Sequence, residues 1–270
     1  MTTDENDPLL RHLIELVKEL DADDIAVILG GGMSLYLRLK YMTSQTPRYP
    51  FDVPARSTND LDFFLSSELI ADLKKIEALR RSLARLGYQV DPKARNFQFM
   101  KGVQLYGQDR IIKIDLLAAP PSQANKAKVQ IKGMRIKPAG AEGIHAYLTN
   151  EAAGIDIGKQ AVDIGRLDEE LQLKNEVLFV PSAYNYLILK LHAFEDRKNK
   201  DDEKSNLGRH HALDIFATLI RMGEKDWAIA KEHFAKDKEQ PYLISARGIR
   251  KENFLERTGL GLLRLRDNES

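Results

Sequence analysis

The sequence predicts an α/β (α+β) protein in which helices flank a mixed β-sheet and a C-terminal helical domain follows. Up to about residue 180, short apolar runs with strand spacing alternate with longer runs of helical spacing. Beyond that point the helical spacing dominates. The chain has 270 residues, enough for one large or two modest domains. We therefore expect an α/β domain over residues 1–180 and a helical domain over 181–270 that closes a cleft.

The first elements are a helix, a strand and a second helix. Apolar residues recur at helical spacing from Pro8 to Leu20, with a proline at the first turn. The apolar run Ile25 to Leu29 reads as a buried strand, and three glycines, Gly30, Gly31 and Gly32, end it. Helical spacing resumes from Met33 to Tyr41. This order predicts a strand, a glycine turn and a helix.

An inserted loop and another strand and helix come next. Tyr41 to Ala55 holds three prolines, which exclude a long helix or an inner strand. Leu61 to Leu65 is apolar and short, so we expect a strand. Glu68 to Leu86 is amphipathic with helical spacing, and Gly87 is a stop signal.

The spacing of apolar residues assigns the remaining strands and helices. Strand-like runs separated by turn residues cover Tyr88 to Val90, Phe97 to Val103, Ile111 to Leu117, Val129 to Pro138 and Val177 to Val180. Helical spacing covers Ala183 to Lys198, Arg209 to Met222, Lys225 to Phe234 and Lys251 to Leu263.

Composition excludes several classes of protein. Lys and Arg number 41 against 40 Asp and Glu, so no broad cationic field exists and any contact with nucleic acid must be local. With no cysteine there is no disulfide, thiolate zinc site or cysteine nucleophile. The acidic N-terminus lacks signal-peptide features, and no apolar run approaches a membrane span. We expect a cytoplasmic protein without membrane contact.

Two aspartates open one of the predicted strands. Asp60 and Asp62 are two residues apart, so on a strand they point to the same face, while Leu61 and Phe63 point into the core. Two negative charges at such a short separation repel each other unless a cation, an arginine or a proton lies between them. The other interpretation makes Asp60 a turn or cap residue and Asp62 a solvated strand position.

A third aspartate lies on another strand. In Ile111 to Leu117, Ile112 and Ile114 share one face, and Asp115 lies on the other. If this strand lies beside the first, three carboxylates meet in an oxygen site suited to Mg²⁺ or Mn²⁺. We therefore predict Asp60, Asp62 and Asp115 as metal ligands and catalytic residues. Two such ions could activate an attacking hydroxyl and stabilise a leaving pyrophosphate.

The glycine turn offers the complementary half of a site. Gly31 and Gly32 allow backbone N–H groups to approach a ligand, and the following helix N-terminus favours an anion. Ser34 can donate one more hydrogen bond. The segment is not a Walker A loop, because no Gly-Lys-Ser/Thr follows.

These residues resemble the DNA polymerase beta-like nucleotidyltransferase superfamily, especially its AbiEii-type toxin branch. The resemblance rests on residues 31–35, then Arg-Ser-Thr-Asn-Asp-Leu-Asp-Phe at 56–63, then Lys113-Ile114-Asp115. It continues through residues 180–182, 189–193 with Arg197, and 209–214. The loop 41–55 is longer than the family's usual stretch, which suggests a lid or an acceptor-binding loop, and residues 199–208 form a second insert.

The resemblance implies a nucleotidyltransferase-type sheet, an NTP substrate and metal at the three aspartates. It also implies that Gly31, Gly32 and Ser34 hold nucleotide phosphates and that Lys190 reaches the nucleotide. Arg56 either contacts the nucleotide or pairs with the acids.

The helical half adds its own candidates. Lys190, Phe194 and Arg197 share one helical face, so two cations flank a ring that a base and its phosphates could meet. A plain solvated stripe is the other interpretation. The histidines His192, His210 and His211 lack zinc spacing and are interpreted as structural, and Tyr184 and Tyr186 as packing residues.

Two functions follow from these patterns. One is transfer of a nucleoside monophosphate from an NTP to an acceptor, which is a tRNA end, a protein or a small molecule such as an aminoglycoside. A toxin–antitoxin or abortive-infection setting would add a cognate antitoxin protein as partner. The other function is a non-catalytic module that binds a nucleotide or a partner on the same fold.

Overall fold

The computed structural model describes most of the chain. The described residues are 8–42, 49, 60–94, 96–105, 107–140, 143–168, 171–202 and 206–267. They divide into two compact units. The sheet unit comprises the described parts of Met1–Met42, Arg56–Thr149 and Lys159–Val180, and the helical unit those of Thr43–Ala55, Asn150–Gly158 and Pro181–Ser270.

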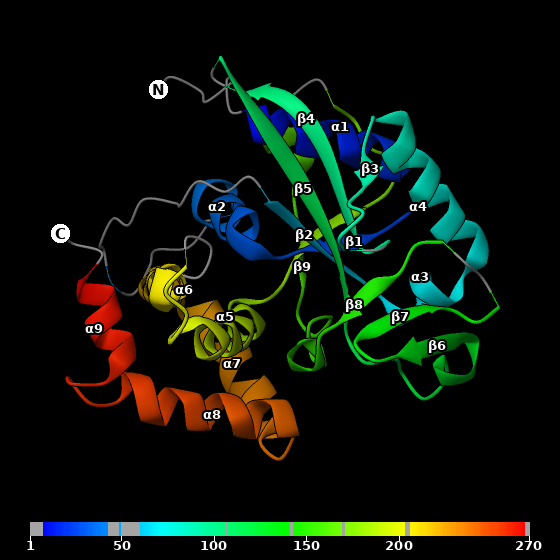
Figure 1. Ribbon diagram of the computed structural model, residues 1–270. Coiled ribbons are helices and arrows are strands. Elements are labelled where there is room, and N and C mark those ends of the chain that lie inside the picture. The colour runs from blue at the N-terminus through cyan, green and yellow to red at the C-terminus, as the bar shows by residue number, and fades with distance from the viewer. Residues whose placement is uncertain are drawn as a thin grey trace. The chain divides into compact units, whose positions relative to one another are not determined.

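The sheet unit alternates strands and helices (Figure 1). Its helices are α1 (Pro8–Ala22), α2 (Gly31–Tyr41), α3 (Ser67–Ala71), α4 (Leu73–Arg85) and the short turns η1 (Lys126–Lys128) and η3 (Ile164–Arg166). Its strands are β1 (Val27–Leu29), β2 (Asp60–Leu65), β3 (Gln89–Val90), β4 (Gln98–Leu105), β5 (Gln108–Ala118), β6 (Val129–Lys132), β7 (Arg135–Pro138), β8 (Ala146–Leu148), β9 (Gln160–Ala161) and β10 (Leu178–Val180).

These strands form one mixed sheet. Its order is β6-β7-β8-β5-β2-β1-β10-β9, and β4 pairs with both β3 and β5. The β2–β5, β5–β8 and β1–β10 pairs are parallel, and the other pairs are antiparallel. The expected mixed sheet with flanking helices and C-terminal helices is therefore confirmed.

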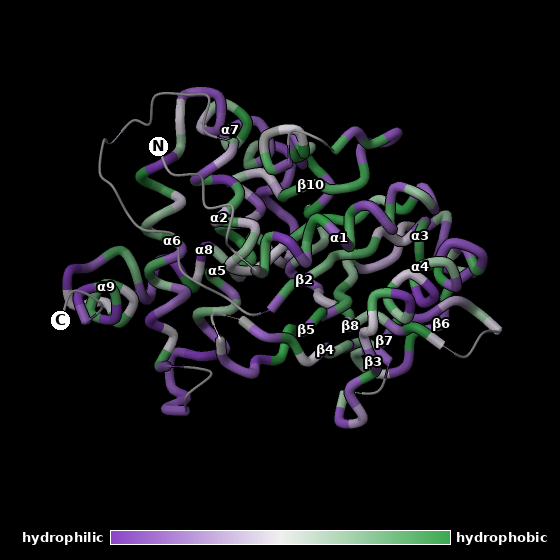
Figure 2. The backbone as a smooth tube through the Cα atoms, turned by 90° about the horizontal axis from the view of Figure 1, so that it is seen from above, coloured by the Kyte–Doolittle hydropathy of each residue, from purple (hydrophilic) through white to green (hydrophobic). Residues whose placement is uncertain are grey.

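One face of the sheet carries the core. Apolar side chains of α1, α3 and α4 pack there against alternate residues of β2 and β5, including Leu61, Phe63, Ile112 and Ile114. Figure 2 shows hydrophobic stretches gathered around the strands, with hydrophilic residues frequent in the turns. Because strand side chains alternate, the other face of β2 and β5 receives the polar residues.

Three predicted elements prove to be divided. The helix expected over Glu68 to Leu86 is two helices, because extended Asp72 caps α4 by accepting from the N–H of Lys74 at 2.9 Å. The strand expected over Val129 to Pro138 is the β6–β7 hairpin, and Gly133 at φ +62° makes its turn.

The last predicted helix is also divided. In place of one helix over Lys251 to Leu263, α8 (Pro241–Phe254) ends early and α9 (Leu260–Arg266) follows. A Cβ on Gly259 would lie 2.5 Å from the carbonyl oxygen of Asn253. Glycine is therefore needed where the chain turns back on α8.

The helical unit is built on α5 (Ala183–Arg197). It also contains η2 (Asn150–Ala152), η4 (Asn206–Gly208), α6 (Arg209–Arg221), α7 (Glu224–Asp237), α8 and α9. Residues 150–158 join it because the amide of Asn185 donates to the carbonyl oxygens of Gly154 at 2.6 Å and Ile157 at 2.8 Å. No helix in the described part of the chain is long and apolar enough to cross a bilayer.

Candidate functional site

The strand β2 presents its two aspartates on the face opposite the core. Leu61 and Phe63 are buried in that core, whereas Asp60 is exposed and Asp62 half-buried. The alternation follows from the period of a strand, which places Asp60 and Asp62 on one side. Rigid packing of the apolar residues therefore fixes where the two carboxylates point.

The strand β5 places the third aspartate directly beside them. In the parallel β2–β5 pair, Asp62 is in register with Asp115, and Asp60 with Lys113. Paired residues on neighbouring strands point to the same face and lie about 5 Å apart. The expected adjacency of the two strands is confirmed, and one lysine lies among the three acids.

The glycine turn packs onto Asp62. The N–H of Gly30 donates to the carbonyl oxygen of Asp62 at 2.7 Å. Gly31 has φ +60°, and a Cβ there would lie 1.9 Å from a carboxylate oxygen of Asp62. Both the positive φ and the close approach of the Asp62 carboxylate disfavour a side chain at Gly31. The turn thereby brings a helix N-terminus against an aspartate.

That helix is α2, which begins two residues earlier than expected, at Gly31. Its first N–H groups lack partners within the helix and favour negative charge. Ser34 lies in the same first turn and is 1% exposed, and its hydroxyl finds no hydrogen-bond partner among the described residues. A buried hydroxyl without a partner is costly unless a ligand or water satisfies it.

Charge and burial act on Asp115. Burial raises the pKa of Asp115 above the ordinary aspartate value, and the nearby charge of Asp60 raises it further. The side-chain amide of Gln98, which donates to Asp115 at 2.5 Å, and the charge of Lys113 lower it. The net direction is upward, so this carboxyl group holds a proton more readily than a solvated one.

Gln98 is the member of this site that sequence reasoning missed. It starts β4 and lies in register with Asp115 on the antiparallel β4–β5 pair. A glutamine at the head of an apolar strand gives little signal by itself. Recognising it requires the strand pairing, which the sequence does not state.

The fit of a metal ion depends on the two aspartates in register. Among the described residues, no group of three or more His, Asp or Glu side chains is arranged to hold a metal ion. Asp62 and Asp115 nevertheless present carboxylate oxygens on one face, and the negative charge of Asp60 adds a repulsion that a bound cation would relieve. Such a pair suits Mg²⁺, which commonly takes one or two carboxylates and completes its shell with water and substrate phosphates.

The predicted cations of the helical unit have different surroundings. The ammonium of Lys190 lies 2.6 Å from the carboxylate of Asp214 on α6, and the two side chains are 7% and 1% exposed. It also lies 5.1 Å from the ring centroid of Tyr186. Lys190 is thus part of a buried ion pair inside this unit.

The face that Lys190 shares with Phe194 and Arg197 does not present a ring. Phe194 is 0% exposed and packs against Phe254, with centroids 4.9 Å apart. The expectation that this ring meets a base is wrong, because the helix turns it into the core between α5, α6 and α8. Arg197 is exposed.

The remaining predicted residues lie outside the described part of the chain or within the helical unit. Arg56 and most of the insert 41–55 lie outside the described residues. Tyr184 and Tyr186 are buried, which confirms them as packing residues. His192 contacts the carbonyl oxygen of Tyr242 at 3.0 Å, and His210 contacts Asn206 at 3.2 Å, so both have structural partners within the helical unit.

Comparisons with known proteins give only distant likenesses. The sequence matches no protein-family model and no curated protein. The solution structure of the antibiotic-resistance factor ANT(2'')-Ia is 11% identical, with a TM-score of 0.41 over 86% of this chain and 95% of that one. The crystal structure of ANT(2'')-Ia with adenylyl-2''-tobramycin is 10% identical, with a TM-score of 0.37 over 88% and 97%.

A third likeness is to an antigenic nucleotidyltransferase-like protein from Paracoccidioides brasiliensis. It is 11% identical, with a TM-score of 0.37 over 90% of this chain and 94% of that one. At these scores none of the three likenesses assigns a family or an activity to this chain.

Proposed function

We propose that this protein is a metal-dependent nucleotidyltransferase that moves a nucleoside monophosphate from an NTP to an acceptor. The observation that carries the proposal is the register of Asp62 with Asp115, with the glycine turn packed directly onto Asp62. Acidic oxygens and the start of a helix, whose N–H groups suit a phosphate, are thereby neighbours. Phosphoryl-transfer sites need both, since catalysis there rests on positioning and charge stabilisation.

Each residue has a role in this proposal. Asp62 and Asp115, with Asp60 beside them, would hold Mg²⁺ or Mn²⁺, and the bound ion would supply positive charge for the triphosphate and the leaving pyrophosphate. The N–H groups at Gly31 and Gly32 bind phosphate oxygens, and the buried hydroxyl of Ser34 donates to one. The deep position of Ser34 and its lack of a partner among the described residues support this role.

Asp115 is the proposed proton acceptor. The acceptor hydroxyl loses its proton to Asp115, its oxygen forms a bond to the α-phosphorus, and the bond to pyrophosphate breaks. Its register with Asp62 places this carboxylate beside the proposed metal and phosphate positions. The hydrogen bond from Gln98 holds the carboxylate in place.

The proposal extends to the family of the protein and to its acceptor. We assign the chain to the DNA polymerase beta-like superfamily and its AbiEii-type branch on the motif at residues 56–63 and on Asp115. The acceptor is then a tRNA end, a protein or a small molecule in the cytoplasm, and a cognate antitoxin restrains the enzyme. Arg56, within the motif at residues 56–63, is a further nucleotide contact in this assignment.

The direct test follows label from NTPs. Purified protein, each of the four α-labelled NTPs, Mg²⁺ or Mn²⁺ and cell extract should yield label on RNA, protein or a small molecule. Asp62→Asn and Asp115→Asn should abolish it. Asp109→Asn is the matched control, because Asp109 is an exposed residue at the start of the same strand.

A non-catalytic binding module is the second candidate. It is favoured by the burial of Asp115, which disfavours the charged carboxylate that a metal ion requires. In that case no NTP gives labelled product with either metal, while NTP binding persists. Labelling that survives Asp62→Asn would contradict the roles assigned to the acids.

A further inference from the structure

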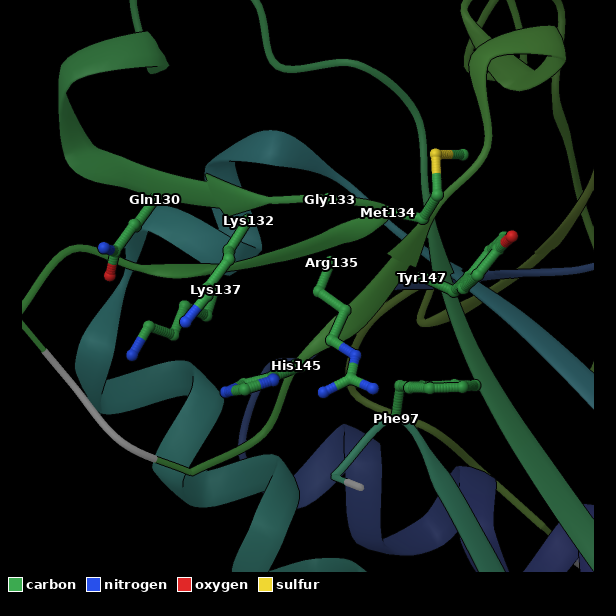
Figure 3. Close-up of a pocket in the computed structure, with 9 residues that line it drawn as sticks. All are labelled: Phe97, Gln130, Lys132, Gly133, Met134, Arg135, Lys137, His145 and Tyr147. Carbon is green, nitrogen blue, oxygen red and sulfur yellow. The ribbon is translucent and has the colours of Figure 1, made fainter. Parts of the chain in front are cut away.

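A second polar site lies in the sheet unit, on the hairpin β6–β7 and its neighbour β8. It is a pocket of 710 Å³ shown in Figure 3. Its lining consists of Phe97, Gln130, Lys132, Gly133, Met134, Arg135, Lys137, His145 and Tyr147. We call it the hairpin pocket. None of these residues belongs to the acidic site.

The hairpin pocket concentrates positive charge. Lys132 and Arg135 are in register across the hairpin, and Lys137 follows on the same face of β7. Figure 3 shows the three side chains extending from the hairpin toward His145 and Phe97. Within the described residues no carboxylate forms an ion pair with any of the three, so their charges repel each other and favour an anionic ligand.

The pocket also contains aromatic rings. Phe97 and Tyr147 contact each other with centroids 5.6 Å apart, and the guanidinium of Arg135 lies 5.8 Å from the centroid of Phe97. Tyr147 is 39% exposed. An exposed ring beside cations is the combination that binds a base by stacking and its phosphate by charge.

Strand register links the hairpin pocket to the acids. Tyr147 pairs with Leu117, which is two residues beyond Asp115 on the same face of β5. Phe97 adjoins Gln98, whose amide donates to Asp115. Two strand residues span about 7 Å, so Leu117, and with it the Tyr147 end of the hairpin pocket, lies close along β5 to Asp115.

We infer that the hairpin pocket binds a nucleotide, with its base against Phe97 and Tyr147 and its phosphate among Lys132, Arg135 and Lys137. The nucleotide is either free or the end of a single-stranded nucleic acid. A polycationic acceptor is disfavoured, because the three cations would repel it. The role of this nucleotide as the acceptor rests on the proposed function, whereas its binding does not.

The test measures binding without catalysis. A fluorescein-labelled RNA hexamer is titrated with full-length protein, and fluorescence anisotropy gives the dissociation constant. Arg135→Gln/Lys137→Gln should weaken binding at least about tenfold and flatten its salt dependence, because two phosphate contacts are lost. Tyr147→Leu should weaken it about tenfold, since a stacked base is worth about 1–3 kcal/mol.

The control is Lys128→Gln, which removes one charge just before β6, outside the hairpin pocket. It should leave the dissociation constant within about twofold. Circular dichroism melting verifies that each variant folds. If the double variant does not fold, exposed Lys132→Gln replaces it.

Competition identifies the source of the nucleotide. Displacement of the hexamer by unlabelled nucleoside monophosphates supports a site for free nucleotide, and displacement by unlabelled hexamer alone supports the end of a strand. The inference is overturned if the hexamer does not bind, if Lys128→Gln weakens binding as much as the double variant, or if inorganic phosphate competes equally well and Tyr147→Leu has no effect.

The same titration separates this inference from the proposed function. Asp62→Asn should retain hexamer affinity while losing nucleotidyl transfer. Wild-type protein that binds the hexamer but transfers no label from any NTP would support the hairpin pocket and contradict the proposed reaction.

Discussion

Two pairs of partly or fully buried charged residues differ in sign and therefore in what they can do. In the sheet unit, Asp62 and Asp115 stand in register with the same charge, and Asp60 adds to it. In the helical unit, Lys190 and Asp214 carry opposite charges 2.6 Å apart. An opposite pair is satisfied by itself, whereas a like pair needs a cation, a proton or a donor. A cluster of like charges therefore indicates a ligand-binding site more clearly than a buried pair of opposite charges does.

The largest expected effect is on nucleotidyl transfer. Asp62→Asn should lower kcat/KM by about a thousandfold, which corresponds to about 4 kcal/mol of transition-state stabilisation. The amide is nearly the same size but removes a charged metal ligand. Steady-state kinetics against Asp109→Asn measures it. Equal rates in the two variants would mean that the like pair is not the reactive centre.

The next effect is on stability and concerns the opposite pair. Lys190→Met should lower the free energy of unfolding by about 3 kcal/mol, because Asp214 is left buried without its counter-charge. Adding Asp214→Leu should restore most of the loss. Urea unfolding of the two variants gives both values.

Lys236→Met is the control for that experiment, because it breaks the exposed pair with Glu232 and should change stability little. If Lys190→Met instead leaves stability intact and raises KM for NTP, the lysine serves the nucleotide, and its pairing with Asp214 is secondary.

A smaller effect tests the contact between the glycine turn and Asp62. Gly31→Ala should lower the free energy of unfolding by about 2 kcal/mol, because it adds strain at positive φ and a clash with the carboxylate. Gly107→Ala, at φ +74° with open space around it, isolates the strain. Similar losses in both variants would show that Asp62 is not pressed against the turn.

The smallest effect concerns the pH dependence of stability. Burial raises the pKa of Asp115 in the folded protein, so this group contributes most stability below about pH 4, where it is protonated in both states. That contribution is lost as pH rises through the folded pKa. Asp115→Asn should therefore raise the melting temperature at pH 7 relative to wild type and leave it unchanged at pH 3.

Added Mg²⁺ should reduce the pH 7 difference, because an ion that binds the folded wild type stabilises it. Melting curves at the two pH values, with and without Mg²⁺, provide the measurement. If Asp115→Asn instead melts at a lower temperature than wild type at pH 7, the charged carboxylate of Asp115 does not destabilise the folded protein.

Several features were determined by the sequence alone. Strand alternation placed Asp60, Asp62 and Asp115 on polar faces, since the period of two is local and independent of neighbours. The glycines after β1 predicted a turn, because the conformational freedom of glycine is also a local property. The change of apolar spacing near residue 180 predicted the C-terminal helices, because helical and strand periods differ along the chain itself.

Other features were decided only by the tertiary structure. The strand register pairs Gln98 with Asp115 and Tyr147 with Leu117. The sequence does not reveal such pairs, because contacts between distant segments leave no local pattern in it. Packing of α5 against α6 gave Lys190 a buried counter-charge and hid Phe194. Sequence spacing fixes which residues share a face, but only the partners of that face determine whether its charges remain available to a ligand.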